Sequence, residues 1–507
     1  MDFQALCFKL KEIYNLYQND EIILNKLGNY INNDLPLLLD NTKKNNQERS
    51  NRKLLLTSAH NDFVKTFLLK HENTYFYNNT AEIFFIYSND NISNVKEDKI
   101  IYNILSAISE TNNNSDEKKD LKQQLIPWKY KIKASILKNV RERNIFDCKT
   151  TDNTISLVLS LFQNKFNPIF SSENQVKYFL IILGDHILKK HNSNIYISSF
   201  HLRPLIRFLE NYGGKYFGHI PVQNSFRYKY HGHKYEDIRL VPINEFKLTE
   251  ELMDGLGKNI LNIFCVAAHL STIFNSSDEF VKDTKDINLL KYSFFLKNNS
   301  QDEIITIFIN DKIEETSDCT INIKNMIFLW KCFLRERKLP NIIFMANLKK
   351  LLMGQLNYKD DDELFIDYTS SCLPIVSNFI KFWEQNIIEN TNEFYLEISE
   401  LLFLFKSSMG KLSNNMNEDD ILNLIRHFYP DIIIDNNKYL ISISCAIWDK
   451  KKDIIDFFNS IELKDKSDLN ELFTQYLEFN KKNSKKNKFP IINKNYFELF
   501  LNENLKN

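Results

Sequence analysis

The sequence predicts a mainly α, multidomain protein with small β-hairpins, which places it in the α+β class. The first observation behind this prediction is that apolar residues recur at helical spacing in many segments of the 507-residue chain. The second is that one order of elements, an amphipathic helix, a second helix and a short hairpin, occurs twice, at 323–374 and again at 397–448. This order is typical of winged-helix units, which bind nucleic acid or dock protein and rarely catalyse.

In the first repeat, an amphipathic helix is predicted over 323–337 and is ended by Leu339-Pro340. A second helix is predicted over 341–356, and the flanks of 364–373 have the composition of strands.

In the second repeat, residues 419–428 are predicted to be helical, and Pro430 ends that helix. Apolar runs at 431–435 and 438–444 flank Asn436-Asn437, a pair suited to a tight hairpin turn. Tandem winged-helix-like units are therefore expected in the C-terminal half.

The N-terminal segment is predicted to be an ordinary core-facing helix, followed by a break at Leu35-Pro36. Polar stretches at 41–53 and 111–122 lack apolar periodicity and are expected to separate a small N-terminal domain from the middle of the chain. The apolar residues at helical spacing in the first helix are Phe3, Leu6, Cys7, Leu10, Ile13, Tyr14 and Tyr17.

The middle of the chain is predicted to be mixed α/β. Helices are expected between 127 and 190, then a strand at 194–198, a helix over 201–212 and a hairpin between 225 and 243. Gly213-Gly214 is expected to cap the preceding helix.

The chain is expected to divide into several domains, as its length suggests. These are an N-terminal helical domain (1–123), a basic mixed α/β middle domain (124–248), a helical region (249–321), a first winged-helix-like unit (322–375), a second (376–460), and a linker with a C-terminal tail (461–507).

Composition limits the function classes. Lys and Arg number 65 and Asp and Glu number 65, so no global field draws the protein onto polyanions, and a nucleic-acid site must be a local patch. Glycine is scarce, at 10 residues, and neither G-x-x-x-x-G-K-[ST] nor G-x-G-x-x-G occurs. An ATPase or a dehydrogenase is therefore disfavoured, and no cofactor is expected.

The seven cysteines are odd in number, widely spaced and never form C-x-x-C, which indicates free thiols in a reducing compartment. No apolar run approaches the roughly 18 residues that span a bilayer. The expected location is the cytosol or the interior of a virion, without membrane attachment.

A basic segment at 129–143 is the first candidate nucleic-acid site. The segment contains several cations and only one acidic residue, Glu142. Its apolar stripe predicts a core-packed helix, whose basic flanks would contact phosphate groups. A solvated charged face is the alternative. The candidate residues are Lys129, Lys131, Lys133, Lys138, Arg141 and Arg143.

A second candidate lies on the predicted hairpin, where cations and histidines alternate with aromatic residues. Stacking of bases on rings, with cations on the phosphates, is the physical basis of single-stranded RNA binding. A half-buried strand has the same pattern, and the pair His231 and His233 could instead hold a metal. The candidate residues are Arg227, Tyr228, Lys229, His231, His233, Lys234 and Arg239.

Catalytic patterns are weak. Cys265 and His269 lie one helical turn apart, as a thiolate–imidazole pair could, but packed helix residues have the same spacing. The acidic run 360–363 could hold a cation, although solvated loop charges are expected between a helix and a strand. No Ser/His/Asp constellation is recognisable, so a non-enzyme is favoured.

In each repeat the second helix is the one expected to meet a partner, through Lys349 and Lys350 in the first and Arg426 and His427 in the second. Two cations per helix are few for a sequence-specific DNA-binding protein. Acidic residues in the first turn of this helix in the second repeat would repel phosphate, so protein docking is favoured.

The C-terminal tail is a further candidate partner site. It comes after a lysine-rich linker, and it could fill a groove on a partner or pack back on its own domain. Its apolar residues are Tyr496, Phe497, Leu499, Phe500 and Leu501. The spacing from Tyr496 to Leu501 resembles the Y-x-x-x-x-L hook of proteins that bind cap-binding translation factors, although Asn502 stands where that motif has an apolar residue.

Three strings carry a resemblance to a known family. They are Pro-Trp-Lys-Tyr-Lys at 127–131, Tyr-Phe-Leu-Ile-Ile-Leu-Gly-Asp at 178–185, and Leu-Trp-Lys at 329–331 followed by Leu-Pro-Asn-Ile-Ile-Phe at 339–344. The chain resembles an uncharacterised protein family of giant, amoeba-infecting DNA viruses, which implies a cytoplasmic infection cycle with virus-encoded expression machinery.

Two further resemblances concern the C-terminal half. Residues 323–374 are similar to the C-terminal winged-helix region of poxvirus-type helicase-primases, although the missing phosphate loop excludes the helicase itself. Helices followed by a winged helix also resemble scaffold subunits of translation-initiation complexes.

These observations together predict a non-catalytic scaffold or adaptor in viral gene expression, which joins protein partners to nucleic acid, RNA in particular. The expected location is the host cytoplasm, in the viral factory, with packaging in the virion as an addition. A metal-dependent nucleic-acid-processing enzyme and a structural virion protein are the alternatives.

Overall fold

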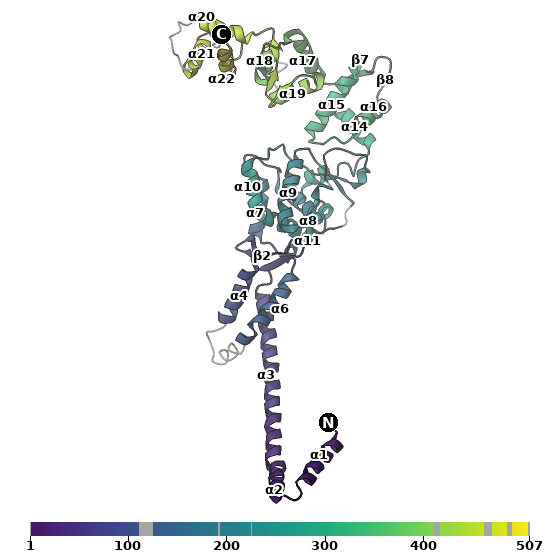
Figure 1. Cartoon of the computed structure of the whole chain (residues 1–507). Coiled ribbons are helices and arrows are strands. Elements are labelled where there is room, and N and C mark those ends of the chain that lie inside the picture. The colour runs from purple at the N-terminus through teal and green to yellow at the C-terminus, as the bar shows by residue number, and fades with distance from the viewer. Residues whose placement is uncertain are drawn as a thin grey trace. The chain divides into compact units, whose positions relative to one another are not determined.

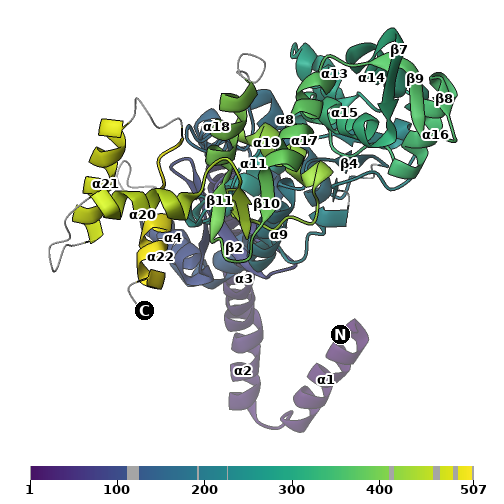
Figure 2. The ribbon, with the colours of Figure 1, turned by 90° about the horizontal axis from the view of Figure 1, so that it is seen from above.

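The computed structural model describes residues 2–110, 125–190, 193–224, 226–409, 416–460, 469–483 and 489–504. The chain is mainly helical with small sheets of two or three strands, so the predicted fold class is confirmed. It forms two compact units (Figures 1 and 2): an N-terminal unit, Met1–Tyr228 with Glu236–Lys297, and a C-terminal unit, Asn298–Asn507 with the short segment Lys229–Tyr235.

The N-terminal unit begins with helices α1 (Phe3–Leu16) and α2 (Glu21–Asn29), a π-helical turn (Tyr30–Asp34) and α3 (Leu35–Lys70). No residue of α1 or α2 is buried. The prediction that the first helix faces a core is therefore wrong, although its helical state is correct.

Helix α3 is long (Figure 1). After its apolar start at residues 35–39, the next part of the helix is polar. The stretch 41–53, predicted to be a linker, lies within it. Pro36 lies in the first turn of α3. The N–H groups of a first turn have no partner within the helix, so the missing N–H of proline costs no hydrogen bond and Pro36 is compatible with the start of a helix. Only the last part of α3, from His60 onward, contributes buried side chains.

The end of α3 packs with an antiparallel meander of β1 (Tyr75–Asn78), β2 (Ile83–Ser88) and β3 (Asn91–Val95), and with helices α4 (Glu97–Glu110) and α6 (Lys129–Arg141). Residues before and after the expected boundary near 124 share this hydrophobic cluster. Its buried members are Phe67, Tyr75, Phe84, Ile100, Ile104, Ile108, Ile132, Ile136, Leu137 and Val140.

The rest of the N-terminal unit is a helical core around α8 and α11. Its helices are α7 (Asp152–Phe162), α8 (Glu173–Ile187), α9 (Leu202–Phe217), α10 (Glu250–Lys258), α11 (Ile260–Phe274), α12 (Ser277–Asp283) and α13 (Ile287–Ser293). Gly184 lets α8 approach α11, since a Cβ added there would lie 2.1 Å from the carbonyl oxygen of Ala267. Gly213, predicted to be a cap, lies inside α9 against Phe264, and Gly218 ends that helix with a φ of 78°.

A small parallel sheet replaces the hairpin predicted over 225–243. Strands β5 (Phe226–Arg227) and β6 (Ile238–Leu240) each pair in parallel with β4 (Ile195–Ile197), in the order β5-β4-β6. The strand predicted at 194–198 is confirmed. The hairpin is wrong, because the strands on either side of the segment Lys229–Tyr235 pair with a third strand and not with each other.

The first repeat in the C-terminal unit contains both predicted helices and a hairpin, but the hairpin strands lie at 358–359 and 364–369 and not within the predicted 364–373. These elements are α15 (Ile323–Glu336), α16 (Met345–Gln355), β8 (Tyr358–Lys359) and β9 (Leu364–Thr369). Before them stand α14 (Gln301–Lys312) and β7 (Glu314–Asn322), which the sequence did not assign to the repeat. The antiparallel sheet has the order β7-β9-β8, so the first repeat is helix, strand, helix, helix and hairpin.

The second repeat contains a helix, a strand, two helices and a hairpin in the same order and has the corresponding sheet order, β11-β13-β12. It adds two strands, β10 and β14, which pair with each other in a separate sheet. Asn436 and Asn437 form its hairpin turn with φ angles of 49° and 56°, as predicted. Its elements are α17 (Leu373–Asn386), β10 (Ile387–Glu389), β11 (Tyr395–Glu397), α18 (Ile398–Met409), α19 (Glu418–Phe428), β12 (Ile434–Asp435), β13 (Tyr439–Ile441) and β14 (Ile443–Cys445).

Three helices close the chain: α20 (Lys450–Ser460), α21 (Leu469–Asn483) and α22 (Lys494–Asn504). Part of the predicted linker is therefore helical, while Lys485, Lys486 and Lys488 lie outside the described residues. All seven cysteines are free. Among the described residues no single helix is long and apolar enough to cross a membrane; α10 and α11 reach that length only as a pair, bent by 64°.

Candidate nucleic-acid interface

Helix α6 is the element on which the first set of predicted cations lies. Pro127 stands in the short 3₁₀ turn that leads into it, and Ile132, Ile136, Leu137 and Val140 are buried. Burial of this stripe fixes the rotation of the helix. The predicted core-packed helix with basic flanks is confirmed.

The lysines of α6 lie at or near the surface. Lys131 and Lys138 are exposed, and Lys129 and Lys133 are half-buried. The ammonium group of Lys131 is 4.4 Å from the centre of the Trp128 ring, which holds it in a cation–π contact. Within the described part of the chain, Lys131, Lys133 and Lys138 form no ion pair with a carboxylate. These lysines keep their charge available to an anion.

A groove of about 700 Å³ runs along one side of α6. Its cations, Lys133, Lys138 and Arg141, outnumber its acids, Glu97 and Glu142. Arg141 pairs with Glu97 at 2.8 Å across the groove, in an exposed pair that contributes little to stability. A phosphate group could therefore compete for Arg141 at small cost.

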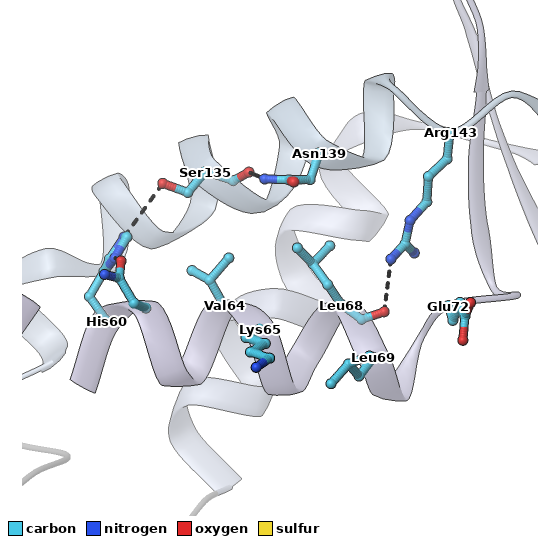
Figure 3. Close-up of a pocket in the computed structure, with 10 residues that line it drawn as sticks. His60, Val64, Lys65, Leu68, Leu69, Glu72, Ser135, Asn139 and Arg143 are labelled. Carbon is cyan, nitrogen blue, oxygen red and sulfur yellow. Dashed lines mark hydrogen bonds between the residues drawn. The ribbon is translucent and has the colours of Figure 1, made fainter. Parts of the chain in front are cut away.

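A second groove, of about 500 Å³, lies between α6 and α3 (Figure 3). Its lining combines apolar side chains of α3 with polar side chains of both helices. Figure 3 shows Ser135 of α6 directed toward His60 of α3, while the Asn139 side chain lies along α6 and donates to the carbonyl oxygen of Ser135. The lining residues are His60, Asn61, Val64, Lys65, Leu68, Leu69, Glu72, Ser135, Asn139 and Arg143.

Arg143, at one end of this second groove, is a structural residue. Its guanidinium donates to the main-chain carbonyl oxygens of His71 at 2.7 Å and Leu68 at 2.8 Å (Figure 3 shows the Leu68 bond). Leu68 belongs to the last turn of α3, where carbonyl oxygens have no partner within the helix. His71 is the residue at the C-cap of α3, and its carbonyl oxygen also accepts from the Thr74 N–H at 3.3 Å. Arg143 therefore caps α3, and it differs in this from the lysines of α6.

Ser135 and His60 do not form a hydrolytic pair. Ser135 Oγ lies 3.5 Å from His60 Nε2, at the limit of a hydrogen bond, and the other ring nitrogen is 3.0 Å from the amide oxygen of Asn61. No carboxylate orients this imidazole in the described groove. Ser135 also stands inside a helix, where main-chain N–H groups are already bonded and cannot stabilise an oxyanion.

The second predicted RNA site is dispersed. Arg239 is 4% exposed and makes a bidentate ion pair with Asp278, at 2.8 and 2.7 Å, while Arg227 donates to the carbonyl oxygens of Asn224 and Phe226. Both guanidiniums serve the fold of the parallel sheet. The prediction that Arg239 contacts nucleic acid is therefore wrong.

The aromatic residues of that second site make contacts within the protein. Tyr230 packs on Phe344 with ring centres 5.1 Å apart, and the Tyr235 hydroxyl donates to the carbonyl oxygen of Ile342 at 2.7 Å. Tyr228 is half-buried beside Phe200. Lys229, His231 and Lys234 are exposed and His233 is half-buried, but they stand in an irregular segment and do not share a strand face.

In the first repeat, the residues predicted to meet a partner border an acidic hairpin. Lys349 of α16 pairs with Glu363 at 3.0 Å, and Lys350 is exposed. The exposed turn between β8 and β9 carries Asp360, Asp361 and Asp362, with Lys359 paired to Asp362. These are the solvated loop charges expected from the sequence.

In the second repeat, α19 packs against α15 of the first. His427 is bonded to the carbonyl oxygen of Lys324 at 2.8 Å and to the ammonium of Lys331 at 3.1 Å, and Phe428 packs on Phe328. His427 therefore joins the two repeats to each other, so it is not open to a partner as predicted. Arg426 is exposed and donates to the side chain of Asn437 in the hairpin turn.

The C-terminal tail packs back on its own unit, which was the alternative to the hook. Its predicted partner-binding residues are buried, so that prediction is wrong for this structure. Lys450, paired with Glu400 at 2.8 Å, lies 3.9 Å from the centre of the Tyr496 ring. The exposed fractions of Tyr496, Phe497, Phe500 and Leu501 are 0%, 0%, 6% and 5%.

Comparisons with known proteins do not add to this description. No protein-family model, curated protein or solved structure matches the chain.

Within the described residues, no group of three or more His, Cys, Asp and Glu side chains could hold a metal ion. Cys265 is fully buried, and burial raises the pKa of its thiol well above the ordinary value, so it is a packed helix residue.

Sequence reasoning missed the second groove. His60 and Lys65 of α3 meet Ser135 and Asn139 of α6 although some 70 residues separate them along the chain. Local spacing cannot reveal such a meeting. The one available signal was that both segments carry apolar stripes at helical spacing, which made them candidates for mutual packing.

Proposed function

We propose that this protein is a non-catalytic adaptor that docks a protein partner through tandem winged-helix units and holds nucleic acid, RNA in particular, on α6. The observation that carries the proposal is the duplication of one topology. Both repeats contain the order helix, strand, helix, helix and hairpin, and in each the strand before the second helix, β7 or β11, pairs with the second strand of the hairpin, β9 or β13. The second repeat adds the strand pair β10 and β14. That connectivity supports a winged-helix assignment for both.

Charge favours protein over duplex DNA as the partner of the tandem units. Residues 301–445 carry 22 acidic and 14 basic residues, an excess that repels a phosphate backbone. Helix α19, which would enter a groove in a DNA-binding winged helix, is engaged with α15. Protein docking needs neither positive charge nor a free α19.

Helix α6 has the opposite character and supports the nucleic-acid half of the proposal. Three of its lysines are unpaired within the described residues, and Trp128 and Tyr130 lie beside them. Rings next to cations suit unstacked bases and their phosphates, which favours single-stranded RNA. The setting, viral gene expression in the host cytoplasm, rests on the resemblance to giant-virus proteins.

The test is RNA binding by the full chain as a function of salt. We expect affinity for a single-stranded RNA to fall by orders of magnitude between low and moderate salt, because each phosphate contact releases counterions. The double variant Lys131→Glu/Lys138→Glu should lose at least about tenfold in affinity and show a shallower salt dependence.

A matched control is the pair Lys350→Glu and Lys359→Glu, two exposed lysines in the acidic first repeat. This control should bind RNA as the wild type does. A salt-independent affinity, or equal losses in the two double variants, would remove α6 as the nucleic-acid site.

A further inference from the structure

The N-terminal tip of the N-terminal unit, residues 3–39, presents an uncovered apolar surface. Of the 38 large hydrophobic residues that are more than a third exposed in the described chain, 14 lie in this tip. They are Phe3, Leu6, Phe8, Leu10, Ile13, Tyr14, Leu16, Tyr17, Ile22, Ile23, Tyr30, Leu37, Leu38 and Leu39.

The size of this surface exceeds what a monomer leaves open. Aromatic side chains offer roughly 150–250 Å² each, and Leu and Ile side chains offer less. Five of the 14 residues are aromatic, nine are Leu or Ile, and all are 37–81% exposed. They therefore present on the order of 1,000–2,000 Å² per chain. Exposed apolar patches on monomers reach only about a few hundred Å², whereas a stable interface buries about 800 Å² on each partner.

The helices of the tip also need packing to be helical. Helix α1 has 14 residues and α2 has nine, and neither buries a residue. Isolated helices shorter than about 12–15 residues are marginal in water, and tertiary contacts supply most helix stability in proteins. The helical state of α1 therefore requires a surface that covers it.

The spacing on α1 indicates what that surface is. Phe3, Leu6, Leu10, Ile13 and Tyr17 are separated by three, four, three and four residues, which is the period of a coiled-coil seam. Such a seam packs on another helix with the same period. A second copy of α1 has this period by definition.

The charges beside the seam allow two copies to meet. The flanking positions are Cys7, Lys9, Tyr14 and Leu16. Lys9, the one charged residue among them, is paired with Glu12 of its own helix at 3.0 Å. No row of like charges opposes self-association.

The tip is set apart from the rest of its unit by the polar part of α3. Residues 40–53 contain no apolar side chain, and this stretch is about 20 Å long at about 1.5 Å per residue. We propose that residues 3–39 of two copies of this chain pack together in one helical bundle, so that the protein is a homodimer joined at its N-terminal helices.

The test is the mass of the full-length protein by light scattering or sedimentation at tens of micromolar. We expect twice the chain mass of 60.2 kDa. The variant Leu6→Glu/Ile13→Glu places two charges in the seam and should run as a monomer, while its remaining helices unfold at the wild-type temperature.

The matched control is Leu54→Glu/Leu55→Glu, which changes two residues of α3 that are 67% and 65% exposed and lie beyond the polar stretch. This control should remain a dimer. A monomeric wild type would overturn the proposal and leave the tip to a different protein. So would a seam variant that stays dimeric, or a control that dissociates.

Discussion

Basic residues that are equivalent candidates in the sequence differ in burial and in hydrogen-bond partners in the structure. Arg143 caps α3 and Arg239 is buried against Asp278, whereas Lys131 and Lys138 face solvent. Removing one partner of a buried ion pair leaves an uncompensated charge, which costs far more than losing an exposed lysine. The two arginines are therefore poor targets for a binding experiment, because their loss would disturb the fold itself.

His427 is the residue whose titration we expect to matter most for the tandem repeats. Its two ring nitrogens are satisfied only in the neutral form: one faces the carbonyl oxygen of Lys324 and the other the ammonium of Lys331. Burial lowers the pKa of His427 below its ordinary value of 6.5, although its bond to Lys324 acts in the other direction. Protonation would place a second N–H against the Lys331 ammonium.

We therefore expect the folded chain to lose stability in acid. As the pH falls through about 6.5, the unfolded chain takes up a proton that folded His427 resists, so the free energy of unfolding decreases. Urea unfolding of the full chain at pH 7.5 and 5.5 measures this decrease. His427→Gln should show a smaller one; an unchanged pH dependence in the variant would contradict the assignment.

At the scale of the elements, two glycines in helices make a matched pair. Gly184 of α8 lies where a Cβ would overlap the Ala267 carbonyl oxygen, while Gly214 of α9 has no atom within 4 Å of such a Cβ. Alanine at either position gains helix propensity, worth up to about 1 kcal/mol. Only at Gly184 must the packing of α8 on α11 change.

We expect Gly184→Ala to lower the free energy of unfolding, because overpacking costs about 1–3 kcal/mol. Gly214→Ala should raise it by about 0.5–1 kcal/mol. Chemical unfolding of both variants beside the wild type provides the measurement. Equal effects at the two positions would show that α8 and α11 are not in close contact.

Local signals predicted many elements and missed those that depend on distant partners. Helices α15 and α19 have apolar stripes, and the two asparagines at the second hairpin have the conformation their type favours. Strand β7 is polar and mostly exposed, and its strand state comes from pairing with β9, where Ile321 faces Phe365. The local sequence pattern therefore does not predict this strand.

The same physical reason explains the error over 225–243. Strands β5 and β6 are short, and each is stabilised by β4, about 30 to 45 residues earlier in the chain. Alternation of polar and aromatic residues between them is typical of a hairpin, but Tyr230 and Tyr235 instead contact the segment Asn341–Phe344. The site prediction failed together with the element prediction on which it rested.

At the scale of the whole molecule, the neutral net charge conceals a separation of charge along the chain. Residues 129–143 carry six cations against one acid, whereas residues 301–445 have eight more acids than bases. This separation supports two kinds of partner for one chain. The α6 segment is suited to phosphate, and the acidic repeats are suited to a protein with a basic surface.

Dimerisation through the tip would give each particle two α6 faces, and this yields a last prediction. A long RNA could occupy both faces, and the second contact then benefits from a high effective concentration, so affinity rises without new contacts. A short RNA can reach only one face. The seam variant Leu6→Glu/Ile13→Glu should therefore lose at least about tenfold in affinity for a long RNA and keep wild-type affinity for a short one.

Titration of both RNAs against wild type and seam variant at one salt concentration provides this measurement. Equal losses for the two RNAs would mean that the substitutions damaged the α6 site itself. No loss for either would mean that the two faces of a dimer bind independently. A loss confined to the long RNA connects the apolar tip to α6, because only a particle with two such faces can distinguish RNAs by their length.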